Sequence, residues 1–120
     1  MGTPTVLVVD DNEKNRTLLF ELFKIKNIDC ICVENGHKAL ANISAAIKLC
    51  IVDFRLSDMN GDEVAKKIKE QYPNMPVIIW TASISKAEKC KVDNKLLFDA
   101  VLLKPIDLQN FEEIIGKFLK

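Results

Sequence analysis

Three carboxylates, a hydroxyl and an ammonium group stand where they could do chemistry together. Asp10 and Asp11 follow the first apolar run of the chain, Asp53 the third, Thr81 the fourth and Lys104 the fifth. Two carboxylates about 5 Å apart repel by roughly 3 kcal/mol at an effective dielectric constant near 20, so three gathered acids need a cation. The ammonium compensates part of their charge, and oxygen ligands of this kind favour Mg²⁺ over Zn²⁺. The same crowding predicts that Asn at position 10 or 53 stabilises the metal-free protein.

A site with these parts could receive a phosphoryl group on an aspartate. A carboxylate attacks phosphorus, while a metal and an ammonium neutralise the charge on the equatorial oxygens and a hydroxyl donates to one of them. Taken singly, each residue has a simpler interpretation, because Asp10, Asp11 or Asn12 could only cap a helix. The functional interpretation therefore depends on whether the fold brings the five side chains together.

The five apolar runs are short, continuous and rich in β-branched residues, which predicts strands that are covered on both faces. We place them at residues 5–9, 30–33, 49–52, 77–80 and 100–103. Helical spacing of apolar residues predicts helices after Asp11 or Asn12, from Ala39 to Ile47, from Gly61, from the Ser85 capping box and after Asp107.

Alternation of strands and helices predicts right-handed crossovers and a parallel sheet. All strands of such a sheet end at one edge, where ligands of open α/β sheets bind. The second strand ends at Glu34 before a plain turn, so we expect it at the margin of the sheet, with the first and third strands adjacent. Trp80 is expected in the core beside Thr81.

Composition narrows the class of protein. A chain of 120 residues predicts one domain over residues 1–120. Seventeen basic residues offset seventeen acidic ones, which argues against direct nucleic-acid binding, and no apolar run approaches the roughly 20 residues that cross a membrane. No signal peptide is evident. The four cysteines lack zinc-site spacing, which predicts reduced thiols in a cytoplasmic protein.

The combined pattern resembles the response-regulator receiver domain, the phosphoacceptor half of two-component signalling. The residues that show the resemblance are Val8 to Asn12, Asp53 followed eight residues later by Gly61, Thr81-Ala82, and Leu103-Lys104-Pro105. The resemblance covers essentially the whole chain. It implies a flavodoxin-like (βα)5 single domain, with a five-stranded parallel sheet in the order 2-1-3-4-5 and helices on both faces.

The resemblance also implies roles for these residues. Asp53 would accept the phosphoryl group, and Thr81 and Lys104 would contact the phosphoryl oxygens. The Mg²⁺ ligands would be Asp10, Asp11, Asp53 and the backbone carbonyl of Arg55. The donor would be a phosphohistidine on a histidine kinase or a histidine phosphotransfer protein. The chain would be a signalling receiver rather than an enzyme, catalysing only phosphoryl transfer to its own aspartate and hydrolysis from it.

Output from such a receiver would go to a further, unidentified protein. If a homodimer forms, the resemblance implies the surface of the fourth helix, fifth strand and fifth helix. Two positions depart from the family pattern: Leu56-Ser57 replaces the common Met-Pro, and Val101 replaces a common Tyr or Phe. In the family, the aromatic ring at this position swings inward on phosphorylation, and valine has no such ring. We therefore expect the conformational change on phosphorylation to pass through the backbone around Thr81 and the fourth helix.

Alternatives stay open at this point. The receiver is either a stand-alone protein or a part of a hybrid kinase or longer regulator. A small Mg²⁺-dependent aspartyl-phosphate phosphatase, similar to the haloacid dehalogenase class, would use the same residue types, but its nucleophile follows the first strand in an Asp-x-Asp motif. A flavodoxin-type flavin carrier would need a phosphate-binding loop where the acidic residues Asp10 and Asp11 stand.

Overall fold

The computed structural model describes the backbone of residues 5–82, 91–92 and 95–119, and the side chains of residues 5–82 and 97–119. The strands are β1 (Thr5–Val9), β2 (Asp29–Val33), β3 (Ile47–Asp53), β4 (Val77–Thr81), β5 (Lys91–Val92), β6 (Lys95–Leu96) and β7 (Ala100–Leu103). The helices are α1 (Glu13–Ile25), α2 (Gly36–Asn42), α3 (Gly61–Gln71) and α5 (Leu108–Phe118). None of these helices is both long and apolar enough to cross a membrane.

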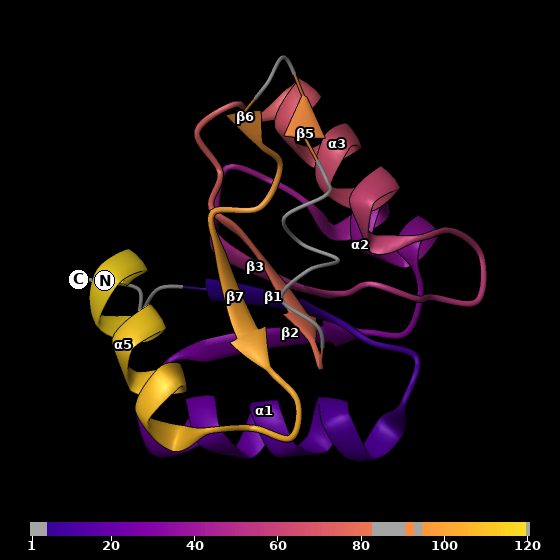
Figure 1. The fold of residues 1–120 in the computed structure, drawn as a ribbon. Coiled ribbons are helices and arrows are strands. Elements are labelled where there is room, and N and C mark those ends of the chain that lie inside the picture. Colours follow the sequence, from indigo (N-terminus) through magenta and orange to yellow (C-terminus); the bar gives the residue numbers. More distant parts are fainter. Residues whose placement is uncertain (1–4, 83–90, 93–94, 120) are drawn as a thin grey trace.

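Five parallel strands form the central sheet in the order β2-β1-β3-β4-β7. Helices α1 and α5 cover one face, and α2 and α3 cover the other (Figure 1). The predicted flavodoxin-like fold with order 2-1-3-4-5 is therefore confirmed, as is the marginal place of the second strand. Strand β1 pairs with β2 on one side and with β3 on the other, so Val8 lies between Cys32 and Ile51.

Two apolar clusters, one on each face, hold the layers together. Alternate residues of β1 point to opposite faces, so Leu7 packs with α2 and α3, whereas Val8 packs with α1 and α5. On the α1 side, the rings of Phe23 and Phe111 meet edge to face with centroids 5.2 Å apart. Full burial of each such side chain contributes about 1.5–3 kcal/mol. These contacts hold the helices against the two faces of the sheet.

Polar caps start three helices directly after strand ends. The Asn12 side chain accepts a hydrogen bond from the N–H of Asn15, so Asn12 rather than Asp11 caps α1. Asn35 caps α2 in the same way, and Asp107 caps α5 as predicted. Because these caps take over the helix N-termini, the carboxylate of Asp11 stays available at the edge of the sheet.

The structure corrects two predictions of local structure. The helix expected from Ala39 to Ile47 ends at Asn42, because Ile43 has extended backbone angles and Ile47 opens β3. The antiparallel pair of β5 and β6 was not expected at all. The expected start of the fourth helix at Ser85 lies outside the described residues.

Candidate functional site

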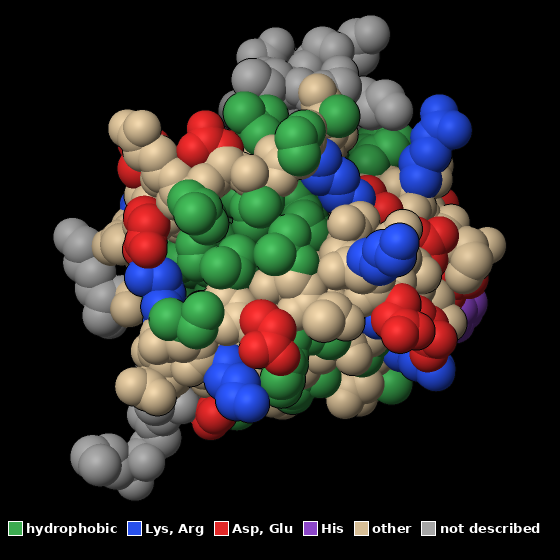
Figure 2. Space-filling view, turned by 90° about the horizontal axis from the view of Figure 1, so that it is seen from below, with side chains coloured by type: hydrophobic (Ala, Val, Ile, Leu, Met, Phe, Trp, Pro, Cys, Tyr) green, Lys and Arg blue, Asp and Glu red, His purple; other side chains and the backbone are tan. Residues whose placement is uncertain are grey.

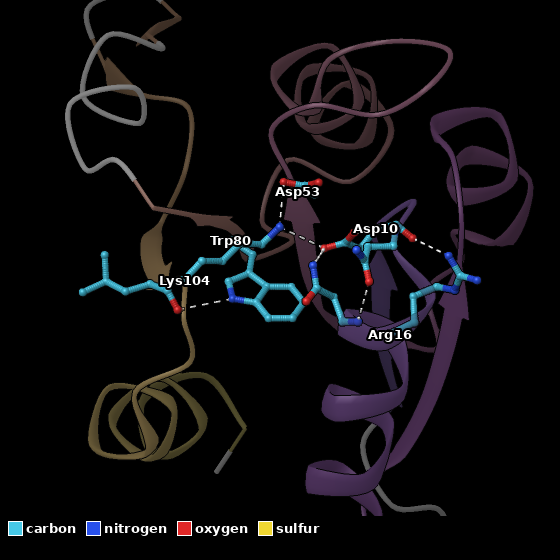
Figure 3. Close-up of polar contacts among 8 residues, drawn as sticks. Asp10, Arg16, Asp53, Trp80 and Lys104 are labelled. Atoms are coloured by element: carbon cyan, nitrogen blue, oxygen red, sulfur yellow. Dashed lines mark hydrogen bonds and ion pairs between the residues drawn. The ribbon is translucent and has the colours of Figure 1, made fainter.

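One ammonium group joins two of the expected acids. Lys104, the residue after β7, places its Nζ 3.1 Å from Oδ2 of Asp10 and 3.1 Å from Oδ1 of Asp53 (Figure 3). Asp10 follows β1 and Asp53 ends β3, so three separate strands deliver these groups to one edge of the sheet. The Lys104 side chain is 24% exposed and that of Asp10 is fully buried. The ion pairs are therefore partly shielded from water and stronger than surface pairs.

Asp10 is anchored through all its oxygens. Its carboxylate accepts hydrogen bonds from the N–H of Asn12 at 2.8 Å and from Nδ2 of Asn15 at 3.2 Å, besides the ion pair with Lys104. Nη1 of Arg16 donates to the Asp10 backbone carbonyl at 2.8 Å. The sequence analysis missed Asn15 and Arg16. Their place in the first turns of the helix that follows Asp10-Asp11 is the signal that could have found them.

The three acids form the one group of metal-binding type among the described residues. One oxygen from each of Asp10, Asp11 and Asp53 can be chosen so that all lie within 4.8 Å of one another. Asp11 is exposed and Asp53 is partly exposed, so the cluster opens to solvent on that side. An all-oxygen donor set with an open side fits Mg²⁺, which keeps several waters when bound.

The surroundings of Asp53 disfavour its charged form. Its burial raises its pKa above the ordinary value, and the nearby charges of Asp10 and Asp11 raise it further. The ion pair with Lys104 acts in the opposite direction but does not cancel the effect. A cation beside Asp53 would therefore stabilise its charged form.

Thr81 and Lys104 are connected through the backbone. Thr81 ends β4 and is buried, and its carbonyl accepts a hydrogen bond from the Lys104 N–H at 3.0 Å. The peptide bond from Lys104 to Pro105 is cis. All five residues singled out from the sequence thus lie at the carboxyl edge of the sheet.

Trp80 is in the core, as expected, but it also contacts the site. Its ring centroid is 4.8 Å from Nζ of Lys104, which is cation–π distance, and its Nε1–H donates to the Leu103 carbonyl at 3.3 Å. The ring is almost completely buried. The indole therefore contacts both the ammonium of Lys104 and the backbone carbonyl just before it, a role that the sequence analysis did not assign.

The loop after Asp53 packs tightly onto the site. The Gly61 N–H donates to the Phe54 carbonyl, and a Cβ at Gly61 would collide with the backbone carbonyl oxygen of Asp53. Arg55 lies in this loop with its side chain exposed, and its backbone pairs with Asn60 in an antiparallel bridge. Val101 is half-buried and packs against the cluster on the α2 and α3 face.

Comparisons with known proteins agree with this geometry. A family model described as the response regulator receiver domain matches residues 6–116. The chain is 30% identical over 118 residues to the autoinducer 1 sensor kinase/phosphatase LuxN of Vibrio campbellii, covering 98% of this chain and 14% of that protein. It is 31% identical over 121 residues to the transcriptional regulatory protein ZraR of Salmonella typhimurium, covering 98% and 27%. The chain thus spans only a minor part of the length of these relatives.

Solved structures share the fold. The chemotaxis protein CheY4 of Vibrio cholerae has a TM-score of 0.85 at 23% identity, covering 98% of this chain and 100% of that one. The response regulator protein TrrA of Thermotoga maritima, solved in complex with Mg²⁺-BeF, has a TM-score of 0.86 at 26% identity, with 98% and 100% coverage. The haloacid dehalogenase-like alternative finds no support in these comparisons.

Replacing Asp53 with Asn stabilises the metal-free protein at neutral pH by roughly 1–3 kcal/mol, because the crowded charge disappears. The raised pKa means that the folded state binds the Asp53 proton more tightly than the unfolded chain does. The wild-type protein therefore loses stability as pH rises from the ordinary carboxyl pKa through the higher pKa of folded Asp53. Below the ordinary carboxyl pKa, Asp53→Asn no longer stabilises the protein relative to wild type. Urea unfolding in EDTA across pH measures the difference, and equal stabilities at neutral pH would contradict it.

Asp10→Asn gives the opposite result, although the sequence alone predicts stabilisation there too. The Asp10 carboxylate accepts hydrogen bonds through both oxygens, and an amide would turn an NH₂ group toward the N–H of Asn12 or toward the donors of Asn15 and Lys104. We expect a loss of about 1–3 kcal/mol in the same unfolding assay. A gain matching that of Asp53→Asn would show that charge alone governs both positions.

Gly61→Ala destabilises the protein by about 1–3 kcal/mol, because the added methyl group meets backbone atoms that cannot move aside cheaply. Gly116→Ala is the matched control, since a Cβ there meets nothing within 4 Å and the helix gains about 0.5–1 kcal/mol. Thermal unfolding of both variants measures the contrast. Similar shifts in the two variants would contradict the close approach at Gly61.

Proposed function

Because the chain belongs to the response regulator receiver domain family, we propose that Asp53 is its phosphoacceptor and that phosphorylation switches its surface. The observation that carries this assignment is the Lys104 ammonium, held 3.1 Å from both Asp10 and Asp53. The donor is a phosphohistidine of a histidine kinase or a histidine phosphotransfer protein. The similarity to the sensor kinase/phosphatase LuxN supports a donor of this class.

In the transfer step, an Asp53 oxygen attacks phosphorus, the P–N bond of the phosphohistidine breaks, and the imidazole leaves with the electron pair. Lys104 then pairs with a phosphoryl oxygen, and the Thr81 hydroxyl donates to another. Asp10 stays in place because its partners Asn12 and Asn15 hold it. Hydrolysis then removes the phosphoryl group: water attacks phosphorus, Asp53 leaves as a carboxylate, and inorganic phosphate is released. The chain thus catalyses both steps on its own aspartate.

Asp10, Asp11 and Asp53, with the backbone carbonyl of Arg55, are proposed to hold Mg²⁺. When bound, the ion neutralises charge on the phosphoryl oxygens. Support comes from the acidic cluster in this chain and from the Mg²⁺-BeF complex of the similar TrrA.

The output partner and the compartment are also proposals. Relatives include both sensor kinases and a transcriptional regulator, so the receiver itself does not define the output. We propose the cytoplasm, in keeping with the unpaired thiols Cys30, Cys32 and Cys50. A homodimer through the fourth helix, β7 and α5 stays a prediction, because the expected start of that helix lies outside the described residues.

Asp53→Asn abolishes Mg²⁺-dependent labelling by acetyl phosphate, because the amide offers no anionic oxygen to phosphorus. Asp58→Asn is the matched control, since Asp58 lies in the loop that follows Asp53 but pairs with His37 instead of Lys104. Intact-protein mass spectrometry after incubation reports the label. Full labelling of the Asp53→Asn variant would remove Asp53 from the proposed role.

Trp80 fluorescence changes when Mg²⁺ and beryllofluoride are added, because Lys104 exchanges the Asp53 oxygen for the bound group while its ammonium lies over the indole. Trp80 is the single tryptophan of the chain, so the signal is unambiguous. The Asp53→Asn variant should show no change. An equal change in that variant would disconnect the signal from the acceptor.

The donor protein is expected to dock on the exposed apolar side chains of α1 and α5. Figure 2 shows apolar side chains gathered on the face of these helices, and the large exposed ones include Leu18 and Leu108. Both helices start at the site edge, directly after Asp10-Asp11 and Lys104. A protein donor can bury this surface, whereas acetyl phosphate cannot.

Leu18→Ser and Leu108→Ser therefore slow phosphotransfer from a phosphorylated protein donor at least tenfold, equivalent to about 1.4 kcal/mol, without changing labelling by acetyl phosphate. Ile25→Ser is the control, because Ile25 is 77% exposed at the far end of α1. Rapid-quench transfer assays with the best donor from a kinase panel measure the rates. Equal rates for all three variants would place the docking surface elsewhere.

A further inference from the structure

Two cysteines of the edge strand β2 take no part in the acid site. Cys30 and Cys32 are two residues apart on the strand, so their side chains point to the same face. Their Sγ atoms are 3.5 Å apart, and both residues are partly exposed. They lie where α1 packs against β2, at the rim of the cluster that contains Phe23. Two thiols are thus presented together on a fixed backbone.

Two surface hollows give a small ligand access to this pair. One, of about 460 Å³, is lined by Cys30 together with Phe20 and Lys24. The other, of about 210 Å³, is lined by Cys32 together with Arg16 and again Phe20. The ring of Phe20 is therefore the shared wall of both hollows, and it is 43% exposed.

The surroundings favour loss of a proton from one of the two thiols. The hydrogen bond from Cys30 and the positive charge of Arg16 hold the pKa of Cys32 below its ordinary value. The same contact raises the pKa of Cys30. A thiophilic ion bound by both sulfurs would take the place of this contact between them.

We propose that Cys30 and Cys32 form a dithiol site for a single thiophilic ion of the Cu(I) class. Binding forms two S–Cu bonds and releases the protons of the two thiols, and no electron is transferred. Soft thiolate ligands select such ions. A structural Zn²⁺ site would need four ligands, and the described residues that line the two hollows include no histidine and no third cysteine. The site is independent of the phosphoacceptor role.

Titration of the anaerobic, reduced full chain with Cu(I), against a chromogenic Cu(I) chelator, tests this site. The wild-type chain is expected to bind one Cu(I). Cys30→Ser and Cys32→Ser should each weaken the affinity at least 100-fold, because one thiolate is lost. Cys50→Ser is the matched control, since burial raises the pKa of the Cys50 thiol to about 12 and keeps it inert. Cys90→Ser completes the set and should also keep wild-type affinity.

Wild-type affinity in either Cys30→Ser or Cys32→Ser, or loss of binding in Cys90→Ser, would overturn the proposal. Phenylarsine oxide mapping on the wild-type chain provides a second measurement that needs no variant. This reagent joins two thiols with release of one water, and the product should resist excess glutathione. Peptide mass spectrometry should place it on Cys30 and Cys32; an adduct on Cys50 or Cys90 instead would contradict the dithiol.

Discussion

The shared ammonium of Lys104 is the interaction on which the site depends. Without it, the fully buried carboxylate of Asp10 would face that of Asp53 across a partly dehydrated space, at a cost of roughly 3 kcal/mol for charges about 5 Å apart. The ammonium lies at hydrogen-bonding distance from both acids, and the Trp80 ring covers it. The protein therefore keeps the acidic cluster assembled without a bound cation.

The fold supplies the precision that this ion pair requires. Parallel pairing of β1 with β3 and of β4 with β7 sets the strand ends at one level. The backbone hydrogen bond from Lys104 to the Thr81 carbonyl extends this register by one residue beyond β7. The apolar clusters on both faces then hold the strands in this register.

The fold and the meeting of the five residues at one edge of the sheet could be predicted, because both follow from local patterns. Continuous β-branched runs indicate buried parallel strands, and a parallel sheet must gather the residues that follow them. The end of α2 was predicted wrongly, because Ile43 and Ile47 satisfy helical spacing by chance while Ile47 pairs in the sheet with Thr5. The contacts of Trp80 with Lys104 and of Arg16 with Asp10 depend on side-chain packing between elements, which periodicity does not encode.

The most direct test of the shared ion pair is the titration of the Asp53 side-chain carboxyl carbon by ¹³C NMR, without metal, in the wild-type chain and in Lys104→Met. Methionine keeps most of the length and volume of lysine but carries no charge. The account predicts a wild-type pKa for Asp53 above the ordinary carboxyl value and a further rise in Lys104→Met. An Asp53 pKa that is the same in both proteins would show that Lys104 does not hold the acids together.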